Sequence, residues 1–137
     1  QSIMKNYPES IIIGSDQLLV CDGKLFSKSK NISEARSNLI KLKGKKHTLI
    51  SSTYAMKNKK PYFEEAKEAE MLFKNVSQLS IEEYLMEKEK EVLMSVGSYR
   101  IEDNKQYNFL KILKGDHETI IGFPLINLKN KFREDTK

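Results

Sequence analysis

Residues 11–20, which read Ile-Ile-Ile-Gly-Ser-Asp-Gln-Leu-Leu-Val, constrain the fold more than any other segment of the chain. The β-branched run predicts a buried strand, and a polar triplet from Ser15 to Gln17 interrupts it. Burying a lone carboxylate is costly, so Asp16 is expected to be either paired or functional. Two interpretations stay open: a strand-end Asp that accepts hydrogen bonds from a loop, or a group that takes part in chemistry.

A short hairpin is predicted directly after this strand. Asp22-Gly23 is a tight-turn signal, and the chain then returns through Lys24 to Phe26. Lys28 follows the hairpin, which could bring its ammonium group back toward Asp16. A lysine suits phosphate as a point charge, although a solvated surface lysine is the ordinary alternative.

Three helices are predicted, near residues 33–43, 80–90 and 124–131. Ser33 is the expected N-cap of the first, and Ser80-x-x-Glu83 forms a capping box for the second. Pro124 lies near the first position of the third, where its fixed backbone angle is favourable.

Strands are predicted over residues 47–56 and 107–113. Residues 62–76 are ambiguous, because their composition favours a helix while polar and apolar residues also alternate. Helices that alternate with strands indicate an α/β or α+β domain.

Composition narrows the classes of function. The 137 residues suffice for one domain, and the net charge of +5 suits an anionic ligand. Acidic residues interrupt the basic ones and arginines do not alternate with the aromatic residues, so nucleic-acid binding is not implied. No apolar run approaches the ~18 residues of a membrane span. The single cysteine, Cys21, cannot form an internal disulfide, which points to a reducing compartment.

The histidines give no readable metal site. His47 and His117 lack the spacing of a ligand pair, and we expect His47 to be a hydrogen-bonded strand residue. Asp116-His117-Glu118 offers oxygen and nitrogen ligands, but a polar helix start explains this run more simply. Phosphate-loop, dinucleotide-binding and Gly-x-Ser-x-Gly motifs are absent from the sequence.

Several segments, taken in order, resemble the Maf family. The resemblance runs from about Tyr7 to Leu128, and its strength lies in the order and spacing of the pieces. These are Ile11–Gln17, Asp22-Gly23, Lys28, Glu34-Ala35, Leu42-x-Gly-x-x-His47, Leu79-Ser-x-x-Glu83-Tyr84, Gly97-Ser-Tyr99, Gly115-Asp116 and Ile121-Gly-Phe-Pro-Leu125.

The resemblance implies a fold and an activity. The expected fold is α/β, a mixed twisted sheet with flanking helices similar to that of inosine triphosphate pyrophosphatases. A single Maf-like domain is expected over residues 1–137, with residues 62–76 in strands. Maf proteins are cytoplasmic nucleoside triphosphate pyrophosphatases that cleave between the α- and β-phosphates with a divalent metal. Mg²⁺ or Mn²⁺ fits oxygen ligands best, and a homodimer is a further family expectation.

The same resemblance suggests roles for four residues. Asp16 would be the general base, with a metal-ligand role also open, and Lys28 would bind the phosphate chain. Gln17 and Glu102 match the subgroup that prefers 7-methyl-GTP over dTTP and UTP. A carboxylate at Glu102 can accept the N1–H and N2–H donors of guanine, and the Gln17 amide could donate to O6. The alternative for Glu102 is a solvated turn residue.

Two departures from the family pattern bear on the activity. The family domain begins with a strand and a Ser-rich, Arg-containing loop that binds the triphosphate. No segment of this sequence matches that loop, so the chain resembles the later two-thirds of the domain. Lys28 is followed by Ser29 where the family usually has proline. A rival hypothesis is therefore a nucleotide-binding or cell-division regulatory protein without turnover. Another is a truncated domain with an exposed sheet edge that does not fold stably.

Overall fold

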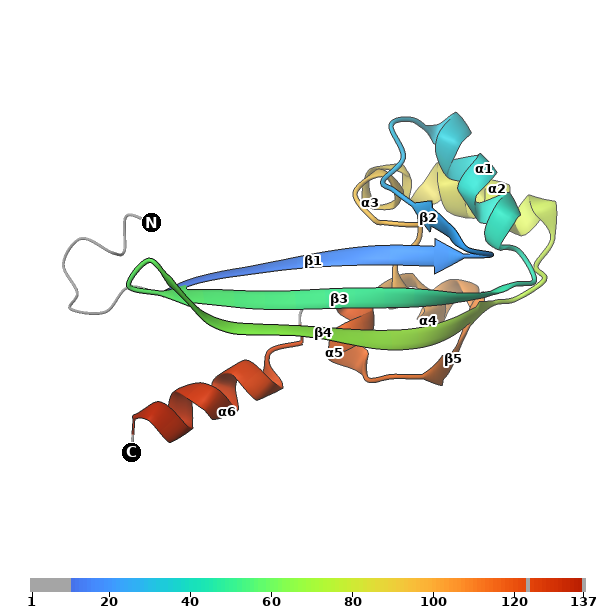
Figure 1. Cartoon of the computed structure of the whole chain (residues 1–137). Helices are drawn as coiled ribbons and strands as arrows, with labels where there is room; N and C mark the ends of the chain where they lie inside the picture. Colours follow the sequence, from blue (N-terminus) through green and yellow to red (C-terminus); the bar gives the residue numbers. More distant parts are fainter. Residues whose placement is uncertain (1–10, 123, 137) are drawn as a thin grey trace.

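A five-stranded antiparallel sheet forms the centre of the molecule (Figure 1). The computed structural model describes residues 11–122 and 124–136. Within them the strand order is β2-β1-β3-β4-β5, and helices flank the sheet, which confirms the predicted fold class. The strands are β1 (Ile11–Cys21), β2 (Lys24–Phe26), β3 (Lys46–Lys57), β4 (Lys60–Phe73) and β5 (Leu110–Lys114).

The ambiguous segment 62–76 lies mostly in β4, as the family resemblance implied. It pairs with β3 along its length after a turn in which Asn58 and Lys59 take positive φ. Its alternation explains the strand: Ala69, Met71 and Phe73 are fully buried, whereas Glu68 and Glu70 on the other face are exposed. Burial of one face outweighs the helix propensity of the composition.

Seven helical segments surround the sheet in the described part of the chain. They are α1 (Ile32–Leu42), α2 (Gln78–Glu87), α3 (Glu89–Leu93), a 3-10 turn (Ile101–Asp103), α4 (Asn104–Tyr107), α5 (His117–Ile121) and α6 (Ile126–Asp135). None of the helices described is both long enough and apolar enough to cross a membrane.

The helices form where they were predicted, but their first residues differ. Asn31, not Ser33, caps α1, because its side chain accepts from the backbone N–H of Glu34 at 2.9 Å. The predicted Ser80 capping box is also wrong: Ser77 caps α2, and Ser80 donates its N–H to it.

Two further element boundaries differ from prediction. Tyr107 ends α4, so the predicted 107–113 strand begins only at Leu110, after Asn108 turns the chain with φ of 52°. Pro124 stands two residues before α6, whose N-cap is Leu125.

The two faces of the long sheet have different surroundings. One face packs on helices and forms the core, with Leu19, Leu49 and Phe73 almost inaccessible to solvent. The opposite face carries no helix along β1, β3 and β4 in the described residues (Figure 1). The prediction of a buried strand at 11–20 is therefore correct only at its end: Leu19 is fully buried, whereas Leu18 is 39% and Ile13 43% exposed.

Candidate functional site

A cavity of about 300 Å³ lies where β1 meets the loop after α3 and the end of α5. Its walls come from β1, from the segment after β2, from residues 94–102 and from residues 120–122. Asp16, Gln17, Lys28 and Glu102 all line it. The fold thus brings the four predicted site residues to one place.

Asp16 is exposed, contrary to the expectation of a carboxylate buried within a strand. Its side chain alternates with that of Gln17 and so projects to the open face of β1, opposite Ser52 of β3. Because β2 pairs only with Leu19–Cys21, Asp16 lines the cavity at the edge of β1 that β2 leaves uncovered. Its Oδ1 accepts the backbone N–H of Gln17 at 3.0 Å, and no described residue forms an ion pair with it. This leaves the carboxylate able to accept a proton or to bind a cation.

Gln17 faces the covered side of the sheet and binds the end of α5. Its Nε2 donates to the carbonyls of Thr119 and Ile120 at 3.1 and 2.8 Å, and it lies 3.3 Å from the hydroxyl of Ser51. These bonds use the donors of the amide, so the expectation that Gln17 donates to guanine O6 is corrected. Oε1 has no donor among the described side chains and backbone groups, and it remains available as an acceptor.

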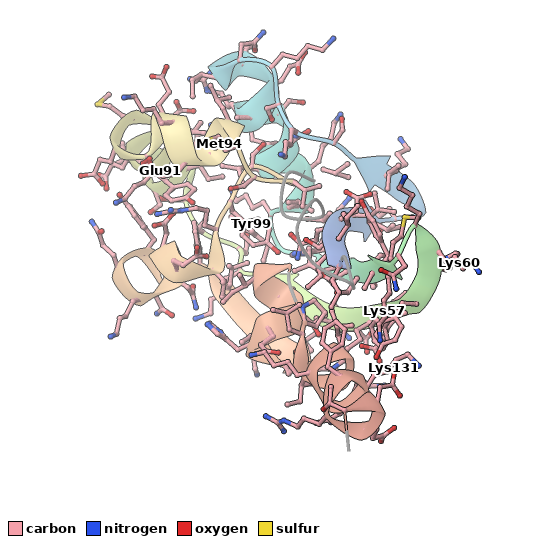
Figure 2. The ribbon with its side chains drawn as sticks, turned by 90° about the vertical axis from the view of Figure 1, so that its left-hand side faces the viewer. Lys57, Lys60, Glu91, Met94, Tyr99 and Lys131 are labelled. Carbon is pink, nitrogen blue, oxygen red and sulfur yellow. The ribbon has the colours of Figure 1, made fainter. Side chains whose placement is uncertain are left out.

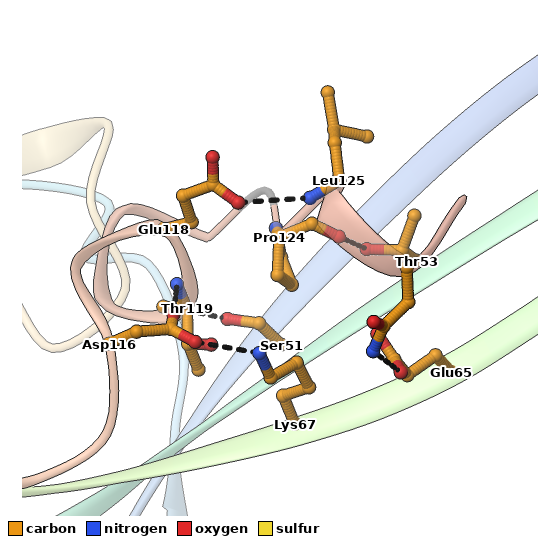
Figure 3. A network of polar contacts seen from close by, with 10 residues as sticks. Ser51, Thr53, Glu65, Lys67, Asp116, Glu118, Thr119, Pro124 and Leu125 are labelled. Atoms are coloured by element: carbon orange, nitrogen blue, oxygen red, sulfur yellow. Dashed lines mark hydrogen bonds and ion pairs between the residues drawn. The ribbon is translucent and has the colours of Figure 1, made fainter. Parts of the chain in front are cut away.

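Helix α5 is fixed to the sheet by a polar network (Figure 3). Asp116 caps α5 by accepting from the Thr119 N–H at 2.8 Å, and its other oxygen lies 2.6 Å from Lys67 Nζ. The Ser51 hydroxyl donates to the Thr119 carbonyl at 2.6 Å, and Thr53 donates to that of Pro124. The hydrogen bond from Lys67 is the main reason that the pKa of Asp116 falls to about 2. The predicted polar helix start is thus confirmed.

The segment that carries Lys28 is tied to the loop after α3. Lys28 forms an isolated antiparallel bridge with Val96, and the Ser29 and Ser98 hydroxyls are 2.5 Å apart. The Asn38 side chain of α1 donates to both hydroxyls, at 3.0 and 3.2 Å. Ser29, which stands where the family resemblance predicts proline, therefore anchors the exposed Lys28 by hydrogen bonds.

Glu102 is an exposed member of the 3-10 turn on the wall of the cavity. Its neighbour Asp103 is 5% exposed and accepts hydrogen bonds from Tyr84 and Arg100. Burial raises the pKa of the Asp103 carboxyl, but these hydrogen bonds outweigh it and hold the pKa below its usual value. The hydrogen bonds of the buried Asp103 therefore fix the 3-10 turn that contains Glu102.

Tyr99 forms part of the inner wall, and Met94 part of the exposed rim (Figure 2). The Tyr99 hydroxyl lies 2.6 Å from His47 Nε2, and both residues are buried. Burial raises the pKa of Tyr99 and lowers that of His47 to about 4. His47 is thus a neutral, hydrogen-bonded strand residue, as predicted.

Sequence reasoning did not identify Arg100, which lines the same cavity. The available signal was its position between Tyr99 and Glu102, two residues already singled out. Across residues 11–122 and 124–136, no group of three or more His, Cys, Asp or Glu is placed to hold a metal ion. The divalent metal stays a prediction.

Comparison with known proteins identifies the family. The family model described as "Maf-like protein" matches residues 1–134. The chain belongs to the Maf family.

Curated relatives of this Maf-family chain carry two names. It is 40% identical over 133 residues to the "7-methyl-GTP pyrophosphatase" of Bartonella henselae, covering 97% of this chain and 67% of that protein. It is 37% identical to the protein of the same name from Bartonella quintana, with the same coverage. It is 33% identical to the "Nucleoside triphosphate pyrophosphatase" of Granulibacter bethesdensis, covering 98% of this chain and 68% of that one.

Proposed function

We propose that this chain is a nucleoside triphosphate pyrophosphatase that hydrolyses the bond between the α- and β-phosphates. The products are a nucleoside monophosphate and pyrophosphate. The observation that carries the proposal is the cavity itself, where Asp16, Lys28, Gln17 and Glu102 meet. Relatives in the same family bear pyrophosphatase names, which agrees with this use of the site.

The phosphate end of the reaction is assigned to Asp16 and Lys28. Attack on phosphorus requires that a water molecule lose its proton and that the charge on the phosphate oxygens be neutralised. The exposed Asp16 carboxylate serves as the base, and the Lys28 ammonium group contacts the phosphate chain. Mg²⁺ commonly binds through one or two carboxylates plus substrate phosphates, so in the alternative role Asp16 would hold such a cation together with the triphosphate. Such a cation supplies additional neutralisation of the phosphate charge.

The base end is assigned to Gln17 and Glu102. Both residues line the cavity and both carry oxygen acceptors, while the amide donors of Gln17 are bound to α5. Guanine offers donors at N1 and N2 that two such acceptors can bind, and methylation at N7 adds a positive charge that Glu102 favours. A pyrimidine lacks this paired donor edge and leaves the acceptors unpaired. We therefore propose 7-methyl-GTP as the preferred substrate.

The test compares pyrophosphate release from 7-methyl-GTP, GTP, dTTP and UTP by the 137-residue chain, in Mg²⁺ and in Mn²⁺. We expect the highest kcat/KM with 7-methyl-GTP and a reduced preference in Glu102→Gln. A higher kcat/KM with dTTP or UTP would contradict the substrate assignment. Calorimetry of the same mixtures measures nucleotide binding. Binding without pyrophosphate release would favour the alternative of a nucleotide-binding protein without turnover.

A further inference from the structure

Arg100 is held at the wall of the cavity by a buried carboxylate. Its Nε and Nη2 donate to the two oxygens of Asp103, at 3.1 and 2.8 Å. Asp103 also accepts from the Tyr84 hydroxyl at 2.6 Å, and Tyr84 in turn accepts the backbone N–H of Arg100 at 3.1 Å. The orientation of the guanidinium group is therefore fixed by two side chains that solvent barely reaches.

The guanidinium group keeps unused donors. It has five N–H donors, and the bonds to Asp103 use one from Nε and one from Nη2. The remaining three have no acceptor among the residues that the structure describes. The side chain is 32% exposed and Arg100 lines the cavity, so a ligand bound there can reach the guanidinium group while it stays in place.

A second arginine shows what is particular about this arrangement. Arg36 of α1 donates to both oxygens of Glu82 at 2.7 and 2.9 Å, with a similar exposure of 39%. The Arg36–Glu82 pair joins two helices and does not line the cavity, whereas Arg100 does. The two pairs have the same donor geometry but different surroundings.

We propose that Arg100 is a second phosphate-binding cation of this site, with Asp103 and Tyr84 as its positioning residues. The inference rests on the proposed function, because it assumes that the cavity takes a nucleoside triphosphate. A planar guanidinium binds two phosphate oxygens at once, and a group already held in place loses little freedom when it binds. Phosphate is a better partner than the base, because 7-methylguanine is itself cationic and would repel the arginine.

Titration calorimetry with ligands that differ in their phosphates tests this assignment. The probes are guanosine, the α,β-methylene analogue of GTP and inorganic tripolyphosphate, each with the wild-type chain, Arg100→Gln, Arg100→Lys and the matched control Arg36→Gln. We expect Arg100→Gln to lose roughly 10-fold or more in affinity for the two phosphate ligands, the effect of losing charge-assisted hydrogen bonds. Affinity for guanosine should stay unchanged, and Arg36→Gln should match the wild type throughout.

The lysine variant separates charge from geometry. Arg100→Lys keeps the charge without the planar fork, so its phosphate affinity should lie between those of the wild type and Arg100→Gln. Asp103→Asn keeps the arginine but weakens its support, and a selective loss of phosphate affinity with an unchanged circular dichroism spectrum would support the positioning role.

Two results would overturn the inference. One is an Arg100→Gln variant that binds the methylene analogue as tightly as the wild type. The other is an equal loss for guanosine and for the analogue, which would place Arg100 against the base. Failure of the wild type to bind any nucleotide is a different result, because it would remove the proposed function first and this inference with it.

Discussion

The two faces of the β1–β3–β4 sheet divide stability and chemistry between neighbouring residues. On the covered face, Leu19 and Leu49 lie in the core and the polar Ser51 and Thr53 fasten α5 and the segment after it. On the open face, Asp16 is exposed on the same strand as Leu19. Because successive side chains of a strand point to opposite faces, a functional group can stand beside a core residue without sharing its constraints.

The largest effect that this division predicts is on turnover. Asp16→Asn should lower kcat for pyrophosphate release by roughly 10²- to 10⁴-fold, the range for removing a general base. Its free energy of unfolding should change little, because the carboxylate is exposed and, among the described residues, it bonds only to the adjacent backbone. Pyrophosphate assays and urea unfolding of the same preparation give both numbers. An unchanged kcat would remove Asp16 from the mechanism.

The open and covered faces can also be compared by two adjacent leucines. Leu19→Ala should destabilise the protein by about 2–5 kcal/mol, because it leaves a cavity in the core. Leu18→Ala removes the same atoms from the open face and should cost less than about 1 kcal/mol. Urea unfolding measures both. Equal losses would mean that another surface covers the open face in solution.

The fold was predictable where the pattern was local. The β-branched run located β1, the Asp22-Gly23 turn signal located β2, and α1 and α2 lie close to the helices predicted near 33–43 and 80–90. The strand at residues 62–76 was not predictable from its composition, because that composition favours a helix and the strand forms by pairing with β3. The caps at Ser33 and Ser80 were wrong because other side chains, Asn31 and Ser77, accept the first N–H groups.

The site was only partly predictable for a similar reason. The four predicted site residues lie in or near recognisable family motifs, and the fold places all of them at one cavity: Asp16, Gln17, Lys28 and Glu102. The hydrogen bonds of Gln17 to α5 join residues far apart in the sequence, so no spacing rule indicates them. Arg100 was missed because its role depends on a buried carboxylate that folding brings to it.

The covered face should also respond to acid through His47. Its pKa is lowered to about 4 by burial, so the unfolded chain binds a proton between about pH 6.5 and 4 that the folded chain does not. The free energy of unfolding should therefore fall by roughly 3 kcal/mol as the pH drops through that window and stay flat above it. Urea titrations at several pH values measure the slope.

Two variants isolate this contribution. His47→Gln should flatten the slope between pH 6.5 and 4, because the buried titrating group is gone. His117→Gln makes the same substitution at an exposed histidine and serves as the matched control. A slope that persists in His47→Gln would assign the acid sensitivity to other groups.

The smallest predicted effect concerns Asp116, which joins α5 to the covered face in two ways. One oxygen caps the helix and the other pairs with Lys67, and the two bonds can be removed separately. Asparagine caps a helix as well as aspartate does, so Asp116→Asn should lose only the partly exposed ion pair, worth less than about 1 kcal/mol. Asp116→Ala loses the cap too and should cost about 1 kcal/mol more.

The pKa of Asp116 adds a pH test to this pair of variants. Because the folded pKa is held near 2, the advantage of the wild type over Asp116→Asn is present above about pH 4 and should vanish as the pH falls toward 2. High salt should reduce the same advantage at neutral pH, since both side chains of the pair are partly exposed. If Asp116→Asn is as unstable as Asp116→Ala, the negative charge at the start of α5 contributes more than the cap hydrogen bond, and high salt should then remove the loss. The bonds from Ser51 and Gln17 to the carbonyls of Thr119 and Ile120 hold α5 on the sheet in all of these variants.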